Sequence, residues 1–87
     1  MTIGGTIAKL ERESTGTRFS FLVRVCTEFF GKPRIKGSHH IFKTPWPGDP
    51  RLNLQAEKGK AKPYQVEQVI AALKKLENIK DLGDNVN

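Results

Sequence analysis

The sequence predicts one small α+β domain, in which a small antiparallel sheet carries helices on one face and leaves the other face open. Two observations support this fold class. Apolar residues recur at helical spacing near both ends of the chain, and the middle third contains extended segments separated by turn-forming residues. The length of 87 residues allows one hydrophobic core. We expect residues 1–80 to form this domain and residues 81–87 to be a frayed polar tail.

Two helices are predicted before the sheet. Residues 1–16 are expected to be an N-terminal extension with a short helix, because Ile3, Ile7 and Leu10 lie at helical spacing. Thr17 is expected to cap a second helix, which Gly31 ends. The apolar residues of this second helix fall on one stripe: Phe19, Leu22, Val23, Cys26, Phe29 and Phe30.

The middle of the chain is expected to form a hairpin. Residues 34–44 contain β-branched and aromatic residues and predict one strand, residues 45–50 are rich in proline and predict a turn, and residues 51–55 alternate as a second, antiparallel strand. Whether residues 57–62 form a third strand or a loop stays open. After them, Pro63 begins a C-terminal helix of about three or four turns, which carries an apolar stripe: Val66, Val69, Ile70, Leu73 and Leu76.

Composition excludes several classes of protein. The single cysteine, Cys26, rules out an internal disulfide and a cysteine-based zinc site, and its place on an apolar stripe predicts a core residue rather than a nucleophile. No apolar run reaches the roughly 20 residues of a membrane helix, and the first residues lack the features of a signal peptide. We expect a cytoplasmic protein without membrane association.

The positive charge of the chain is concentrated in its middle third. Residues 32–62 hold eight basic and two acidic side chains, which accounts for the whole net charge of +6. Decoration of a solvated sheet would spread such charges more evenly, so the pattern favours a polyanionic ligand such as nucleic acid.

The two histidines of the chain, His39 and His40, are adjacent in the predicted first strand. Side chains alternate across a strand, so the two imidazoles should point to opposite faces of the sheet. In one continuous strand His39 would share its face with Ile35 and Ile41, and His40 would share the other with Ser38 and Phe42. This alternation does not tell which histidine faces solvent, and an ordinary structural role for both remains the alternative.

Imidazole among basic side chains suits RNA cleavage. A group that titrates near neutrality can move the proton of the ribose 2′-OH or of the leaving 5′-oxygen, and cations stabilise the charge that develops on the phosphate. Divergent strand histidines without neighbouring cysteine or carboxylate ligands do not predict a metal site, so we expect neither metal nor cofactor. The candidate RNA contacts are Lys36, Gly37, Ser38, Lys43, Arg51, Lys58, Lys60 and Lys62.

Two aromatic residues are further candidates. Trp46 and Tyr64 could stack on nucleobases, whereas a tryptophan between two prolines is as well suited to pinning a turn. The alternative to an enzyme is a non-catalytic module that grips RNA by shape and phosphates.

The segment Gly37-Ser38-His39-His40-Ile41-Phe42-Lys43-Thr44-Pro45 resembles the HicA toxins of bacterial toxin–antitoxin pairs, which carry Gly-Ser-His followed by an aromatic residue and then a proline. The resemblance extends from about Phe19 to Lys75. It departs at Leu54-Gln55-Ala56-Glu57, where many members have Val-Pro followed by a polar residue or histidine, and in the N-terminal extension.

The resemblance implies a fold similar to a double-stranded-RNA-binding domain and an endoribonuclease that cuts messenger RNA and arrests translation. It also implies neutralisation by a HicB-type antitoxin protein. The histidine after Gly-Ser is catalytic in that family, which implies His39 as the catalytic residue here. The role of His40 stays open.

Overall fold

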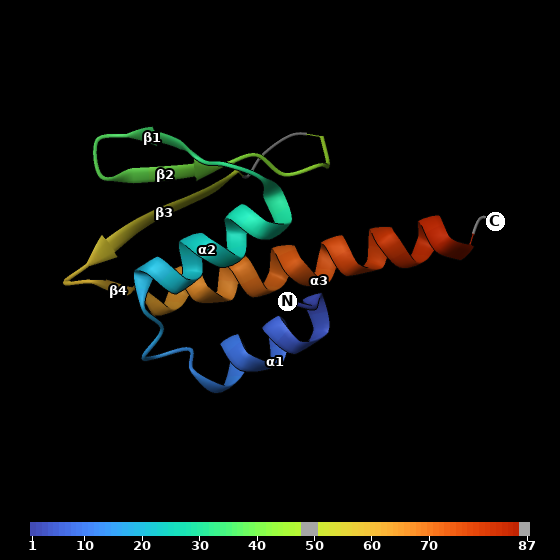
Figure 1. Cartoon of the computed structure of the whole chain (residues 1–87), viewed down its shortest axis with the longest axis horizontal. Coiled ribbons are helices and arrows are strands. Elements are labelled where there is room, and N and C mark those ends of the chain that lie inside the picture. The colour runs from blue at the N-terminus through green and yellow to red at the C-terminus, as the bar shows by residue number, and fades with distance from the viewer. Residues whose placement is uncertain (48–50, 86–87) are drawn as a thin grey trace.

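The computed structural model describes the backbone of residues 1–47 and 51–85 and the side chains of residues 1–47 and 51–79. Within these residues the chain is an α+β protein with helices beside an antiparallel sheet, as predicted (Figure 1). The elements are α1 (Ile3–Arg12), α2 (Phe19–Phe30), β1 (Arg34–Lys36), β2 (His39–Phe42), β3 (Leu52–Glu57), β4 (Lys60–Ala61) and α3 (Pro63–Asn85).

The sheet has the strand order β1-β2-β3-β4, and every neighbouring pair is antiparallel. Its register creates rows of side chains across three strands. One row runs Lys36, His39, Gln55, and the next row along the same face runs Arg34, Ile41, Asn53. The opposite face carries Leu52 and Leu54, both of which are buried. Figure 1 shows the three helices on the buried side of the sheet.

The prediction of one strand over residues 34–44 is wrong. Gly37 and Ser38 form a two-residue hairpin loop between β1 and β2, because Lys36 pairs directly with His39. Gly37 has a φ of +60°, a conformation that glycine adopts without steric cost and that tight hairpins require. The turn also changes the faces, since Ile35 pairs with His40 and therefore lies on its face, not on that of His39.

Helix α2 begins and packs differently from the prediction. Its N-cap is Arg18, whereas Thr17 is buried and donates its hydroxyl hydrogen to the carbonyl of Glu13 at 2.7 Å. The Thr17 carbonyl accepts a hydrogen bond from the N–H of Ala61 at 2.9 Å, so the residue joins the sheet edge instead of capping the helix. Val25, outside the predicted stripe, is fully buried.

The third possible strand exists as β4. Lys58 and Gly59 both have positive φ, and the pair Glu57–Lys60 closes a second two-residue hairpin around them. The Phe19 N–H donates to the Gly59 carbonyl at 3.1 Å, which fixes this hairpin to the start of α2. Of the turn predicted over residues 45–50, residues 48–50 lie outside the described part of the chain.

Helix α3 extends to Asn85, well beyond the three or four turns predicted and into the segment expected to be a tail. Its N-terminal part supplies the largest share of the core, and α1 packs along it. The stripe predicted for this helix is buried as expected: Val66, Val69, Ile70, Leu73 and Leu76.

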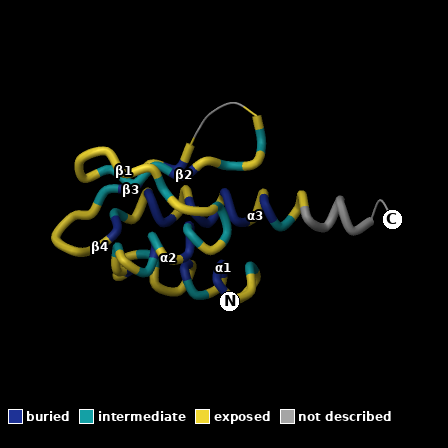
Figure 2. The backbone as a smooth tube through the Cα atoms, turned by 45° about the horizontal axis from the view of Figure 1, so that its top comes forward, coloured by how far each residue is buried: buried dark blue, intermediate teal, exposed yellow. Residues whose placement is uncertain are grey.

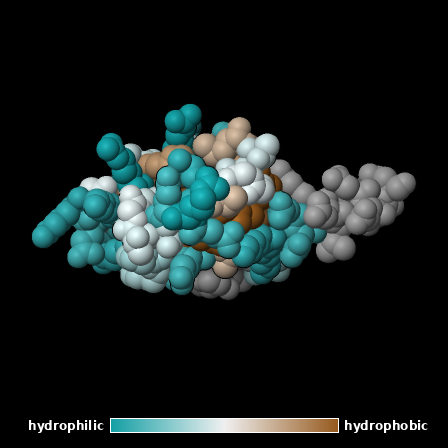
Figure 3. Space-filling model, turned by 90° about the horizontal axis from the view of Figure 1, so that it is seen from below, coloured by the Kyte–Doolittle hydropathy of each residue, from teal (hydrophilic) through white to brown (hydrophobic). Residues whose placement is uncertain are grey.

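Burial divides the molecule into a covered side and an open side. The buried segments of β2 and β3 and the helices face one another, while the outer side of the sheet and the hairpin loops are exposed or intermediate (Figure 2). Seen from the side of α1, the surface is largely hydrophilic with one smaller hydrophobic area (Figure 3). Among the described residues, no helix combines the length and the apolar composition needed to cross a membrane.

Candidate active site on the open sheet face

The structure places His39 on the open face of the sheet. It is half-buried, with Lys36 beside it on β1 and Gln55 beside it on β3. Strand alternation left the choice between the two histidines open. The burial of Leu52 and Leu54 decides it, because these residues share the opposite face with His40.

Asn53 holds the ring of His39. The two residues are diagonal neighbours across β2 and β3, and His39 Nδ1 lies 3.0 Å from Asn53 Oδ1. With Asn53 Oδ1 as the acceptor, the hydrogen is on Nδ1, and Nε2 is the nitrogen left to take up or deliver a proton. The arrangement therefore orients the imidazole and leaves Nε2 outside this contact.

A shallow depression of about 260 Å³ lies beside this imidazole. Strand β3 and the first turns of α3 form its walls, and its lining is polar apart from one aromatic ring: His39, Arg51, Asn53, Gln55, Tyr64, Gln65 and Gln68. The Gln55 N–H donates to Oε1 of the buried Gln65 at 3.3 Å. This hydrogen bond joins α3 to β3 just before Ala56 and Glu57, the two residues of β3 that pair with β4. The depression is therefore bounded by fixed backbone on two sides.

Three of the predicted RNA contacts lie around His39. Lys36 is exposed in the same row, Arg51 lines the depression, and the Ser38 hydroxyl accepts a hydrogen bond of 2.9 Å from Gln55 Nε2. Gly37, in the hairpin loop, is exposed, and a Cβ added there would meet no atom within 4 Å. Its contribution is the shape of the turn that brings Ser38 and His39 to this face.

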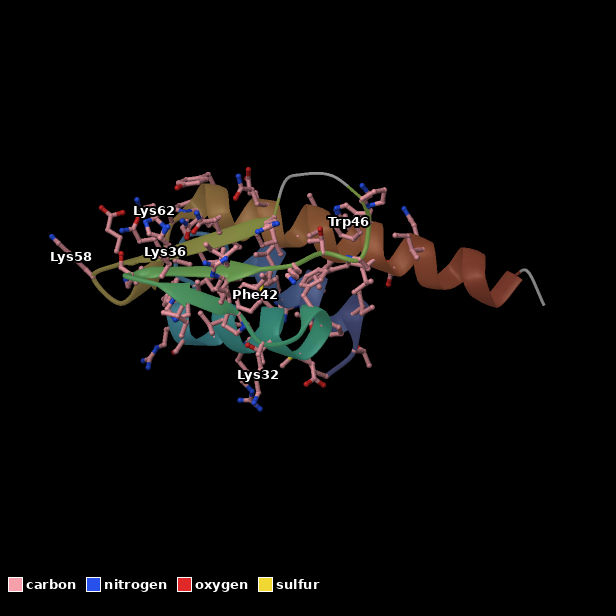
Figure 4. The ribbon with its side chains drawn as sticks, turned by 90° about the horizontal axis from the view of Figure 1, so that it is seen from above. Lys32, Lys36, Phe42, Trp46, Lys58 and Lys62 are labelled. Atoms are coloured by element: carbon pink, nitrogen blue, oxygen red, sulfur yellow. The ribbon has the colours of Figure 1, made fainter. Side chains whose placement is uncertain are left out.

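The other predicted contacts form two further basic regions. Lys43 lines a second depression together with Lys32, Arg34 and Arg51. A third depression, at the β3–β4 hairpin, is lined by Lys58, Lys60 and Lys62. In Figure 4, Lys58 projects from the tip of this hairpin at one end of the sheet, and Trp46 lies toward the other end. Arg51 is the residue shared by the depressions at Lys43 and at His39.

Two other candidates are part of the packing. Cys26 is fully buried in the core, and burial raises the pKa of its thiol to about 12, so almost none of it is the nucleophilic thiolate near neutral pH. Trp46 packs edge-on against Phe30, with a centroid separation of 6.2 Å, and the Lys75 ammonium lies 4.6 Å from the centre of its indole. Trp46 thus fixes the loop after β2, which was the structural alternative for this residue.

Sequence reasoning missed the polar partners of His39. Asn53 and Gln55 alternate with Leu52 and Leu54 along β3, so their common face was predictable. Their contact with His39 was not, since the register depends on the loop between β2 and β3. Gln68 carried no sequence signal. Among the described residues, no three histidine, cysteine, aspartate or glutamate side chains are grouped so that they could hold a metal ion.

No model of a known protein family, no curated protein and no solved structure matches this chain. Support for a function therefore comes from the geometry around His39 and from the resemblance of residues 37–45.

Proposed function

We propose that this chain is an endoribonuclease that cleaves messenger RNA with His39 as its general acid or base, and that it is the toxin of a toxin–antitoxin pair. The observation that carries the proposal is the placement of His39 on the open basic face, with Asn53 on Nδ1 and Nε2 available for proton transfer. The proposed cleavage uses neither a metal ion nor a cofactor.

The reaction that suits this site is attack of a ribose 2′-OH on the adjacent phosphate. The new bond joins the 2′-oxygen to phosphorus, the bond from phosphorus to the 5′-oxygen breaks, and the leaving oxygen receives a proton. His39 Nε2 either takes the proton of the 2′-OH while water supplies that of the leaving oxygen, or, in its protonated form, supplies the proton of the leaving oxygen while water accepts that of the 2′-OH. Arg51, which lines the depression, and Lys36, which pairs with His39 across β1 and β2, are the cations proposed to stabilise the negative charge that develops on the phosphate oxygens.

The remaining parts of the proposal rest on the resemblance of residues 37–45 to HicA toxins. They are a fold of the double-stranded-RNA-binding-domain type, a HicB-type antitoxin as partner and a cytoplasmic location. The α+β architecture and the basic sheet face are compatible with them, and the open position of His39 offers a surface that a neutralising protein can cover.

The test is cleavage of single-stranded RNA by the purified chain in the presence of EDTA. We expect full activity, because the proposed proton transfer requires no metal. A His39→Ala protein purified in the same way controls for contaminating ribonucleases. Activity that disappears with the chelator and returns with Mg²⁺ would overturn the metal-independent mechanism, and tight RNA binding without cleavage would favour the non-catalytic binding module.

A further inference from the structure

The depression beside His39 contains groups that general phosphate binding does not require. Tyr64 is 56% exposed and lines this depression from the first turn of α3, opposite the residues that β3 contributes. It is the one tyrosine of the chain. Exposure of an aromatic ring to water is unfavourable in free energy unless a ligand covers the ring. The ring of Tyr64 lies at the edge of the proposed catalytic site.

Gln68 stands beside this ring. Tyr64 and Gln68 are four positions apart on α3, which places their side chains next to each other on one face of the helix. Both line the depression with His39. Within the described part of the chain, the amide of Gln68 takes no part in the side-chain hydrogen bonds, which are made instead by its neighbours Asn53, Gln55 and Gln65. Gln68 therefore keeps a donor and an acceptor free for a ligand.

We infer that Tyr64 and Gln68 form a subsite for one unpaired nucleobase of the RNA strand whose phosphate lies at His39. The Tyr64 ring stacks on the face of the base, and the Gln68 amide pairs with its edge through one donor and one acceptor. Single-stranded RNA is recognised in this way, by aromatic stacking together with hydrogen bonds to exposed base edges.

The subsite determines the class of RNA that reaches His39. In an A-form duplex the bases are stacked on their neighbours and paired along the edges that an amide would contact, so a duplex cannot offer a base to Tyr64. Arg51 lines the same depression as His39, Tyr64 and Gln68, and its guanidinium suits a phosphate of the bound strand. The inference rests on the proposed function for the position of the phosphate, and it adds the requirement for an unpaired base.

The test separates binding from cleavage. In the His39→Ala chain, single-stranded RNA oligonucleotides carrying one 2-aminopurine at successive positions report stacking through quenching of their fluorescence. We expect quenching at one position, which Tyr64→Leu abolishes and Tyr64→Phe retains, and binding about five- to 150-fold weaker in Tyr64→Leu. Gln68→Leu should weaken binding without abolishing the quenching, and Asn78→Leu, which changes an exposed amide on the same helix outside the depression, should change neither.

The outcomes distinguish the inference from the proposed function. The nucleobase subsite is overturned if adding Tyr64→Leu to the His39→Ala chain leaves the quenching unchanged. It is also overturned if a duplex of the same sequence binds as tightly as the single strand. Both results count even if the wild-type chain cleaves RNA. A wild-type chain that shows Tyr64-dependent quenching but no cleavage overturns the proposed ribonuclease and leaves the subsite standing. Circular dichroism of each variant checks that the fold is intact.

Discussion

His39 and His40 are consecutive in one strand, yet they lie in two different environments. His39 faces the open side among Lys36, Asn53 and Gln55, with a side-chain acceptor on Nδ1. His40 faces the helices and packs edge-on against Phe19 at 5.1 Å between ring centres, and its buried Nδ1 has no partner among the described residues. Strand alternation alone produces this difference, so residue type does not assign a role to either histidine.

The comparison teaches which features support catalysis. A proton-transfer group needs access to a substrate and a second group that fixes its orientation. His39 has both, through the depression and through Asn53. His40 has neither, and its contact with Phe19 fits a packing role.

The largest effect is expected when each histidine is replaced. His39→Ala should lower the cleavage rate by about 10²–10⁴-fold, because that is the usual contribution of a general acid or base, with RNA affinity nearly unchanged. His40→Leu should leave cleavage within a few-fold and the free energy of unfolding within about 1.5 kcal/mol, since an apolar group replaces a buried nitrogen without a partner. Cleavage rates, RNA titrations and thermal melts of both variants check this, and a His40 variant as inactive as the His39 variant would refute the distinction.

The second effect concerns the basic hairpin that lies away from the His39 depression. Changing Lys58, Lys60 and Lys62 together to Gln should reduce the slope of log affinity against log salt by up to about three, since each phosphate contact contributes about one unit. The rate at saturating RNA should stay the same. The triple change Arg12, Arg24 and Lys74 to Gln removes the same charge from the helices. If this control flattens the slope equally, overall charge rather than the hairpin explains binding.

The smallest effect is expected at Asn53, which acts through His39. Asn53→Ala should lower the cleavage rate by about two- to 12-fold, the loss that corresponds to one hydrogen bond, without changing RNA affinity. Asn53→Asp keeps an acceptor for Nδ1–H and should restore most of the rate. If Asn53 only stabilised the fold, both variants would instead have a lower melting temperature, which thermal melting would show.

Periodicity predicted the helices well because their apolar stripes are long. Leu22 and Cys26 on α2 and Leu73 on α3 are buried as expected. The same reasoning failed at Gly37-Ser38, where β-branched and aromatic residues on both sides hide a two-residue turn. It also ended α3 too early, since the polar composition after Lys80 does not by itself end a helix. Local pattern thus identified the elements but not where the chain reverses.

The candidate site was predictable only in part, for a related physical reason. His39, Lys36 and Arg51 were found because imidazole and cations are informative by type. Asn53 and Tyr64 lie near His39 only because of the strand register and the packing of α3 beside β3. Both bring together residues that are far apart in the sequence. Lys58, Lys60 and Lys62 line a different depression from the one at His39, although all of these residues belong to the same basic stretch of sequence.

The most direct test of the central claim is the cleavage rate of the His39→Ala chain with and without added imidazole, at equal RNA saturation. A free imidazole that enters the space left by the side chain should restore part of the rate, with the gain increasing with imidazole concentration and absent in the wild-type chain. Restoration of this kind would show that the missing function is proton transfer at this position. A folded, RNA-binding His39→Ala chain that cuts at the wild-type rate would contradict the account.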